Sequence, residues 1–267
     1  MAKNSSATCA PHKGYSALKL RSLFVVLPML LFVLAGCDSK APVSFNYQCP
    51  ENNLVQLDLI DLSSSGRSKD ILDERLKAIQ LDVERVTDCE GTFTVVAWSV
   101  SSSASFTVFQ GALSTSGATE IGRDRKIPKA VAQTMVEVRA GLTEAFAKVD
   151  PVGSDLFGAL SLAEDQNKIL GESEHLEINI FTDAITNVPP GSVNEPGLSE
   201  DQVSKLAERA TQIDLRDVQI KLIGIGKTGV EITQPPQDYI LLLRSYAEAM
   251  CKNTQAKCIT LTAVIES

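Results

Sequence analysis

Histidine is scarce in this sequence. Two of its 267 residues are His, and only His175 lies beyond residue 36. A Ser nucleophile needs a nearby base, and His175 stands at the start of an expected strand, at the opposite edge from Ser63. A zinc site would need more His residues or a closely spaced Cys pair. We therefore expect neither Ser–His catalysis nor a zinc site.

Positive charge is also in short supply. The chain has 25 Lys and Arg residues against 33 Asp and Glu residues, which gives a net charge of −8. Four basic residues and no acidic ones lie within residues 1–36, so the remainder carries a net charge of −12. Binding to nucleic acid needs a basic face. We expect no nucleic-acid partner, and a dication or a basic ligand fits this balance better.

No apolar run reaches the roughly 20 residues that a membrane-spanning helix needs. The run from Leu23 to Leu34 covers about a dozen residues, follows four basic residues and leads into small residues. That order is typical of a signal peptide. A membrane anchor that is never cleaved is the alternative interpretation.

The end of this run, Leu34-Ala35-Gly36-Cys37, resembles the bacterial lipobox. The resemblance implies a lipoprotein signal peptide over residues 1–36, a lipidated Cys37 and a tether up to residue 50. The mature chain would then be held at the bacterial cell membrane, on its periplasmic or extracytoplasmic face. Asp38 implies retention at the inner membrane in enteric-type bacteria, unless it is simply the first residue of a polar tether.

Six Cys residues are present, and four of them lie beyond Cys37. An even number of Cys residues in an exported chain indicates disulfides, and four Cys residues allow three pairings. Cys251 and Cys258 flank a polar turn before the last expected strand, so we expect them to pair with each other. Cys49 would then pair with Cys89, after the first expected helix.

Apolar runs alternate with helical patterns along residues 51–267, without an internal repeat. Runs rich in Val, Ile, Leu, Phe and Thr predict strands at residues 54–60, 92–100, 105–113, 176–182, 218–225 and 259–265. Helical patterns cover residues 69–87, 128–149, 155–170, 199–213 and 236–250. This alternation predicts one α/β domain, a Rossmann-like three-layer sandwich with a mostly parallel sheet, an antiparallel edge hairpin and helices on both faces.

Oxygen-bearing side chains follow two of these strands. Asp61-Leu62-Ser63-Ser64-Ser65 comes directly after the first strand, and Asp183 comes after the strand that ends near Phe181. Between them, Ser154 precedes an expected helix. Ligands of open α/β sheets gather where the parallel strands end. Asp and Ser also cap helices and form turns, so the Asp61 to Ser65 motif alone is better explained as a helix cap than as a site.

In this order the three loops resemble the von Willebrand factor A-type (VWA) domain, whose metal-ion-dependent adhesion site reads Asp-x-Ser-x-Ser, then Thr, then Asp. The resemblance covers roughly residues 54–267 and includes the segments Gly153 to Leu160 and Ile220 to Gly226. It implies that a metal ion is held by Asp61, Ser63, Ser65, Ser154 and Asp183. The hydroxyls of Ser63 and Ser65 would bind the ion directly, and the two carboxylates would act largely through water.

Hydroxyl and carboxylate oxygens suit a hard dication, which implies Mg²⁺, or Ca²⁺ or Mn²⁺, as the cofactor. By resemblance, one coordination position stays open for a carboxylate from a protein partner. We therefore expect a membrane-anchored, divalent-metal-dependent protein-binding domain. The alternative is a structural scaffold of an envelope or secretion assembly in which the metal only stabilises the fold.

The chain departs from the VWA pattern at several positions. Ser154 replaces the usual Thr but keeps the hydroxyl, and Ser64 stands where Gly is common. Ala184 stands where Gly commonly follows the second Asp, and Ala adopts a positive φ at greater cost. Asp58 is polar in a strand that should be buried on both faces, so we expect it to need a local partner.

Two catalytic interpretations fail on spacing. A phosphate-binding loop at Gly226-Lys227-Thr228 would need Gly at position 221, where Lys221 stands. A phosphatase that used Asp61 as its nucleophile would usually carry a second Asp at position 63, where Ser63 stands. We therefore expect no enzymatic activity.

Two stretches are predicted to be loops from their polar and Pro-rich composition, residues 114–127 and residues 187–197. The second follows the Asp183 loop directly. It would either form a rim of the metal site or be an ordinary surface insertion.

Overall fold

The computed structural model describes residues 45, 47–100, 104–170, 174–189, 191–194, 197–229 and 233–263. The expected signal peptide, Cys37 and Asp38 lie outside these residues. Within the described part, no helix has the length and apolar character needed to cross a membrane.

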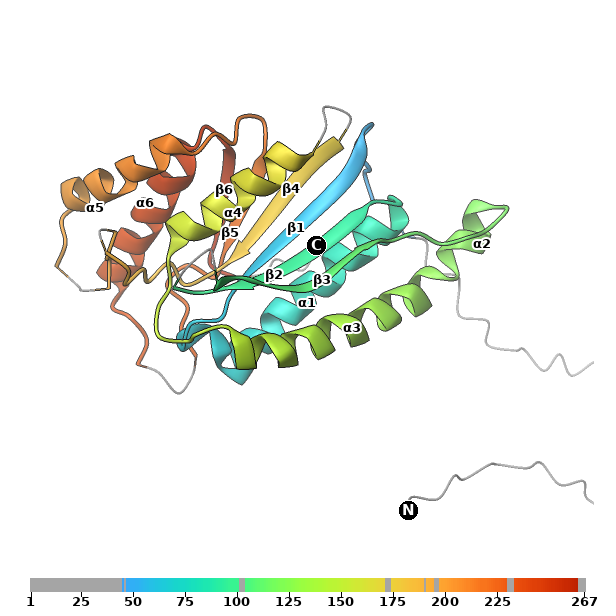
Figure 1. Ribbon diagram of the computed structural model, residues 1–267, viewed down its shortest axis with the longest axis horizontal. Coiled ribbons are helices and arrows are strands. Elements are labelled where there is room, and N and C mark those ends of the chain that lie inside the picture. The colour runs from blue at the N-terminus through green and yellow to red at the C-terminus, as the bar shows by residue number, and fades with distance from the viewer. Residues whose placement is uncertain are drawn as a thin grey trace, which may run out of the picture. The chain divides into compact units, whose positions relative to one another are not determined.

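Six strands form one sheet in the order β3-β2-β1-β4-β5-β6 (Figure 1). The strands are β1 (Asn53–Asp61), β2 (Thr92–Trp98), β3 (Phe106–Ala112), β4 (Glu174–Phe181), β5 (Gln219–Ile223) and β6 (Lys257–Leu261). All neighbouring strands run parallel except β2 and β3, which form the antiparallel edge pair that the sequence predicts. β1 lies at the centre, so the loop that follows it emerges in the middle of the carboxyl edge.

Helices pack on both faces of the sheet (Figure 1). One face carries α1 (Lys69–Asp88) and α3 (Ile127–Lys148), and the other carries α4 (Leu156–Ile169), α5 (Glu200–Ala207) and α6 (Gln237–Asn253). Short helical turns complete the set, α2 (Glu120–Asp124), η1 (Ser65–Arg67) and η3 (Glu208–Gln212). The expected three-layer α/β architecture is confirmed.

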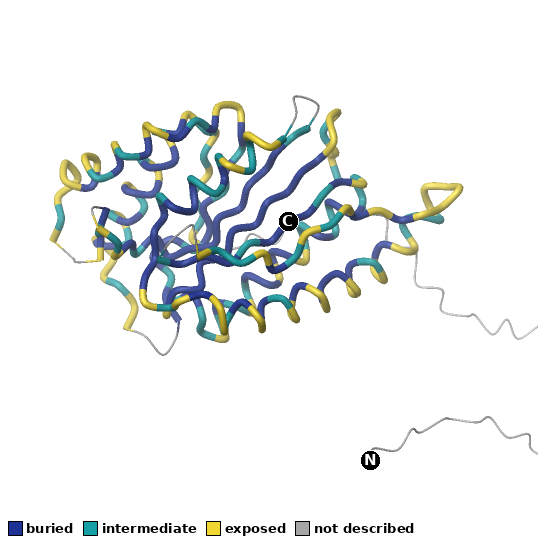
Figure 2. Tube along the Cα trace, viewed as in Figure 1, coloured by how far each residue is buried: buried dark blue, intermediate teal, exposed yellow. Residues whose placement is uncertain are grey.

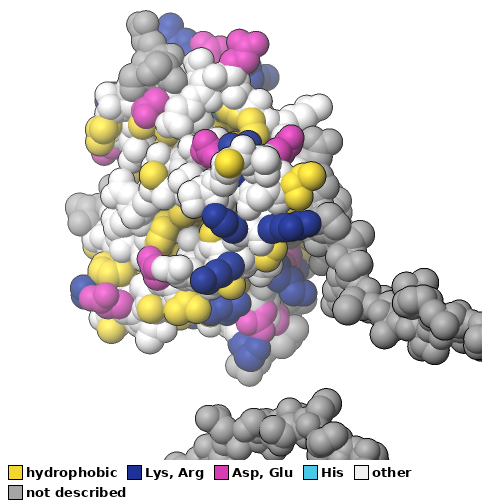
Figure 3. All heavy atoms as spheres, turned by 90° about the vertical axis from the view of Figure 1, so that its right-hand side faces the viewer, with side chains coloured by type: hydrophobic (Ala, Val, Ile, Leu, Met, Phe, Trp, Pro, Cys, Tyr) yellow, Lys and Arg dark blue, Asp and Glu magenta, His cyan; other side chains and the backbone are white. Residues whose placement is uncertain are grey.

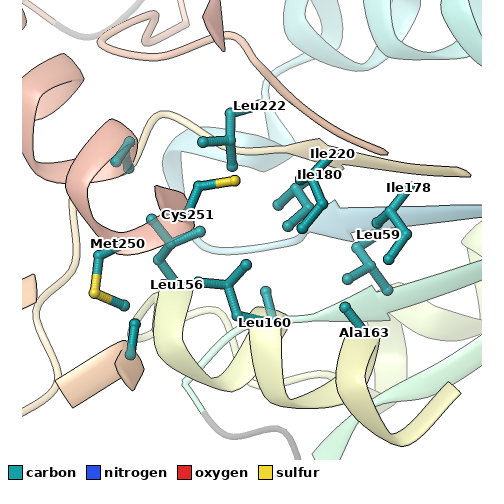
Figure 4. Packing of buried hydrophobic residues seen from close by; sticks show 14 of the residues in the cluster. Leu59, Leu156, Leu160, Ala163, Ile178, Ile180, Ile220, Leu222, Met250 and Cys251 are labelled. Atoms are coloured by element: carbon teal, nitrogen blue, oxygen red, sulfur yellow. The ribbon is translucent and has the colours of Figure 1, made fainter. Parts of the chain in front are cut away.

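The sheet separates two apolar cores, and its central strands are almost entirely buried (Figure 2). Ile178 and Ile220 point to the core under α4 and α6, to which Leu160 of α4 also belongs (Figure 4). Ile60 and Phe93 point to the opposite core, under α1 and α3. Each fully buried side chain of this size stabilises the fold by about 1.5–3 kcal/mol. The two cores hold the sheet rigid, so the loops at its edge start from fixed positions.

Three expected elements differ in their bounds. β6 begins at Lys257, because this residue pairs with Gln219 of β5, and it ends at Leu261 instead of residue 265. The stretch predicted as a loop over residues 114–127 contains α2, which starts where the Thr119 side chain accepts a hydrogen bond from the Gly122 amide. The helix expected over residues 199–213 is divided into α5 and η3.

Both expected disulfides are present, Cys49–Cys89 and Cys251–Cys258. The first joins the segment before β1 to the residue that follows α1. The second joins the end of α6 to β6, so Cys258 lies inside the strand and not before it. Because α1 and α6 run opposite to the parallel strands, both bridges lie at the edge where those strands begin.

Candidate metal centre

The loop after β1 is folded around the Asp61 carboxylate. Its Oδ1 accepts a hydrogen bond from the Ser63 amide at 2.8 Å, which turns the chain sharply at the end of the strand. The loop is fixed from outside as well, because the Arg67 side chain donates to the carbonyls of Leu62 (2.8 Å) and Phe146 (3.1 Å). Ser63 is buried and Ser65 half-buried, whereas Ser64 is exposed.

The loop before α4 brings Ser154 to the same carboxylate. The Ser154 hydroxyl donates to Asp61 Oδ2 at 2.7 Å, across 93 residues of sequence. The Ser154 amide donates to the Asn187 side chain at 2.9 Å, and the Asn187 amide donates to the Ser154 carbonyl at 3.2 Å. The residue 187–197 loop, predicted as either a rim or an insertion, therefore supports the site through its first residue.

The loop after β4 completes the arrangement. Ser65 donates its hydroxyl to Asp183 Oδ2 at 2.5 Å, and Thr182 donates its hydroxyl to Asp61 Oδ2 at 2.9 Å. Ala184 has φ 61°, so the loop keeps the left-handed conformation for which Gly is usual. A left-handed non-glycine residue costs roughly 1–2 kcal/mol, and the surrounding contacts must offset that cost. The departure at Ala184 therefore adds strain to this loop.

All five predicted ligands meet at one edge of the sheet. Asp61 contacts Ser154, Asp183 contacts Ser65, and the hydroxyls of Ser63 and Ser65 lie 3.4 Å apart. The described residues contain no group of three or more His, Cys, Asp or Glu side chains arranged for a metal. Two carboxylates and three hydroxyls form a set of hard oxygen donors, which fits Mg²⁺, Ca²⁺ or Mn²⁺ and does not fit a soft metal.

Charge at the site is concentrated and largely withdrawn from water. Burial raises the pKa of Asp183 to about 6, and the neighbouring Asp61 carboxylate adds to this effect. Two anionic groups so close together are stabilised by a cation between them. The positions of these two carboxylates could be predicted from the sequence, because each directly follows an apolar stretch that forms a strand.

Two residues at the site were not predicted as part of it. Thr182 holds Asp61 and accepts a hydrogen bond from the Ala184 amide at 3.0 Å. Arg75 is buried in α1 and donates to the carbonyls of Asp61 (2.5 Å) and Gly66 (3.3 Å). Thr182 could have been found from its place beside Asp183, but Arg75 lies on a helix among other charged residues and has no distinguishing signal.

Comparisons with known proteins give structural likenesses only. No protein-family model matches the sequence, and no curated protein is similar to it in sequence. One similar solved structure is the conserved hypothetical protein BatB from Bacteroides thetaiotaomicron, with 15% identity and a TM-score of 0.38 over 79% of this chain and 91% of that one. Another is the manganese-loaded TRAP protein of Plasmodium vivax, with 13% identity and a TM-score of 0.39 over 77% and 74%.

A third likeness is to the pilus adhesin SpaC from Lactobacillus rhamnosus GG, with 11% identity and a TM-score of 0.35 over 77% of this chain and 31% of that one. At these values we derive no function from any of the three. The strand order, the antiparallel edge strand and the three loops at the carboxyl edge agree with the fold that the resemblance to the VWA domain implies.

Proposed function

We propose that this protein is a membrane-anchored domain that binds a protein partner through a divalent metal ion. Asp61, Ser63, Ser65, Ser154 and Asp183 would hold the ion, and Mg²⁺, Ca²⁺ and Mn²⁺ all suit them. The observation that carries this proposal is the convergence of these side chains from three separate loops, above all the contact between Ser65 and Asp183. The role is binding and not catalysis.

The donor set also supports the kind of partner. Only two of the five side chains carry negative charge, so a dication held there keeps part of its positive charge for an outside ligand. A carboxylate of a partner protein is the hard anionic group that such an ion accepts. Lipidation of Cys37 would hold this binding surface at the membrane.

Thermal unfolding of the full-length protein tests the metal site. Mg²⁺ or Mn²⁺ should raise the melting temperature of the wild type, because a ligand that binds only the native state adds about 2.7 kcal/mol at one hundred times its Kd. Ser63→Ala should lose this effect. Ser64→Ala is the matched control, since the Ser64 side chain is exposed and donates to the Pro151 carbonyl, 3.0 Å away.

Absence of any metal-dependent shift in the wild type, with no heat of binding by calorimetry, would contradict the metal site. Pull-downs from membranes with and without chelator then test the partner. Proteins retained by the wild type should be released by chelator and should not bind Ser63→Ala. If chelator changes the melting temperature but not the set of bound proteins, the result favours the alternative, a structural scaffold in which the metal only stabilises the fold.

A further inference from the structure

Four polar side chains form a connected series between helix α1 and the sheet. Gln56 and Asp58 belong to β1, Asp82 to α1 and Asn179 to β4. Gln56 Nε2 donates to Asp58 Oδ1 at 2.8 Å, and Asn179 Nδ2 donates to Asp82 Oδ2 at 2.8 Å. Asp58 is 0% exposed, and the two carboxyl groups in the middle are hydrogen-bonded to each other. The candidate metal centre uses none of these four side chains.

The contact between the two carboxyl groups requires a proton. An ionised carboxylate only accepts hydrogen bonds, so two of them offer no donor. Asp58 Oδ2 is buried, and no donor from the described part of the chain reaches it. Such an oxygen is costly unless one group of the pair is protonated, as in other pairs of carboxyl groups that share a site. The structure therefore has a place for one proton between Asp58 and Asp82.

The charges around the pair balance when this one proton is present. Arg85 of α1 donates to both oxygens of Glu177 of β4, at 2.8 and 2.7 Å. The positive charge of Lys221 of β5 stabilises the ionised forms of Asp58 and Asp82. Three carboxyl groups that hold one proton carry two negative charges, and the two basic side chains carry two positive charges. Loss of the proton leaves one negative charge without compensation.

Two further titratable groups face this network. Burial raises the pKa of Tyr47, in the segment before β1, so its phenol stays neutral when the carboxyl groups titrate. His175 Nε2 lies 3.4 Å from Glu177 Oε1 and so acts on the ion pair with Arg85. Within the described part of the chain, neither side chain is hydrogen-bonded to Asp58 or Asp82.

The pair joins the same two elements that lead to the candidate metal site. Asp58 lies three residues before Asp61, which is about 10 Å along a strand. Asp82 lies seven residues after Arg75, so both side chains extend from one face of α1. Arg75 donates to the Asp61 carbonyl. A charge that appears at the pair is therefore felt at the metal site through a buried, weakly screened space.

We propose that Asp58 and Asp82 share one proton, and that this proton opposes the binding of a dication at the candidate metal site. This regulation rests on the proposed function. When the proton is lost to solvent, one more negative charge lies about 10 Å from the site. Its attraction strengthens the binding of a dication by about tenfold. Because linkage is reciprocal, metal binding promotes release of the proton to the same extent.

Calorimetric titration of the full-length protein with Mg²⁺ at pH 5.5 and pH 8.5 tests this proposal. In Asp58→Asn the amide donates to Asp82 in place of the shared proton, so the variant keeps the charge of the protonated pair at both pH values. Its affinity should equal that of the wild type at pH 5.5 and be about tenfold lower at pH 8.5. Asp183 is present in both proteins, so its own titration cancels from the comparison. Asp217→Asn, at an exposed carboxylate before β5, is the matched control and should follow the wild type.

Infrared spectroscopy without metal tests the proton itself. At pH 5.5 the carbonyl band of protonated carboxyl groups should be stronger in the wild type than in Asp58→Asn, by one group. Absence of this difference would overturn the shared proton. Equal pH dependence of the Mg²⁺ affinity in the wild type and Asp58→Asn would overturn the regulation alone, whereas a wild type that binds no Mg²⁺ at either pH would overturn the metal site together with it. Asp82→Asn should reproduce each result, and circular dichroism verifies that both variants are folded.

Discussion

Arg75 is only 6% exposed, and its guanidinium lies directly behind the candidate metal-binding loops, where it donates to the Asp61 carbonyl. A Cβ at Gly66 would come within 2.8 Å of it, so the turn after Ser65 is shaped around this side chain. Its positive charge partly compensates Asp61 and Asp183 when no metal is bound. The same charge repels a dication.

Arg75→Met should therefore raise the affinity for Mg²⁺ by about tenfold or more, because a like charge is removed from a poorly solvated site. The metal-free protein should become less stable, since two carbonyls lose their donor. Arg75→Lys keeps the charge and serves as the control. Isothermal titration calorimetry measures the affinities, and equal values for the Met and Lys variants would show that charge is not the cause.

Asp58 predicts a pH dependence of stability. Burial raises the pKa of Asp58 well above its usual range, and burial raises the pKa of Asp82 beside it to about 6. The folded protein thus binds protons more tightly than the unfolded chain, whose Asp pKa is about 3.9. The protonated pair therefore contributes its full stabilisation below a pH of about 3.9, and this contribution is lost as the pH rises through about 6.

In chelator, the urea midpoint of the wild type should therefore be lower at pH 7.5 than at pH 5. Asp58→Asn should reduce this difference, because it removes one of the two coupled carboxyls and keeps an isosteric side chain. Asp217→Asn, at an exposed position in the turn before β5, should leave the difference unchanged. An Asp58→Asn variant with the full pH difference would exclude this pair as its source.

The sequence predicts the five oxygen ligands because each lies beside a strong apolar pattern that fixes its position. Asp61 and Asp183 end strands, and Ser154 precedes the first turn of α4. Thr182 and Arg75 were missed for opposite reasons. Thr182 lies inside the recognised loop but has no place in the metal motif, and Arg75 reaches the loop only because α1 folds back beneath it.

Among the elements, the two disulfides close loops of very different length. Cys49 and Cys89 are 40 residues apart, and Cys251 and Cys258 are seven apart. In the chain-entropy model, loss of the first bridge costs about 4 kcal/mol and loss of the second about 2.5 kcal/mol. The Cys49→Ala/Cys89→Ala pair should therefore lower the urea midpoint more than the Cys251→Ala/Cys258→Ala pair. The reverse order would indicate that native packing around the buried Cys251 dominates.

The groove of about 620 Å³ beside α1, which Gln219 and Lys221 of β5 help to line, also had a signal in the sequence, but a weak one. β5 alternates between Gln219 and Lys221 on one face and Ile220 and Leu222 on the other. Such alternation is typical of a strand with one uncovered face. Read as a continuous apolar run, residues 218–225 predict a strand that is buried on both sides. The bounds of β6 could not be predicted either, because its pairing with β5 sets where it begins.

For the whole molecule, the site and the start of the described chain lie at opposite ends of the sheet. The ligands follow the carboxyl ends of β1 and β4, whereas residue 47 contacts Asp88 at the end of α1. Seen from the end where the parallel strands begin, the surface carries several Lys and Arg side chains near its middle (Figure 3).

Anchoring through Cys37 is tested by Cys37→Ser. This variant should remain an unlipidated precursor, since Ser offers no thiol for acylation, and its distribution between membrane and soluble fractions should change. Metabolic labelling with a fatty acid measures the modification. Cys9→Ser is the matched control and should be labelled like the wild type. Equal labelling of Cys37→Ser would contradict the lipid anchor.

A second comparison concerns which membrane holds the protein. In a two-membrane host of the enteric type, the wild type should fractionate with the inner membrane, and Asp38→Ser should move toward the outer membrane. Density-gradient fractionation measures both. Wild-type protein already in the outer membrane would exclude retention by Asp38.

The Cys49–Cys89 bridge has a mechanical consequence. It joins the residues that precede β1 to the end of α1, and the candidate metal-binding loop lies between these two elements. If a force pulls on Ser63 while the amino-terminal end is held, both β1 and α1 carry part of the force, because the disulfide joins their far ends. β1 would be pulled lengthwise between β2 and β4, so its two ladders would resist in shear and would have to break together. The candidate metal-binding loop is thus attached to a strand that is hydrogen-bonded along both of its edges.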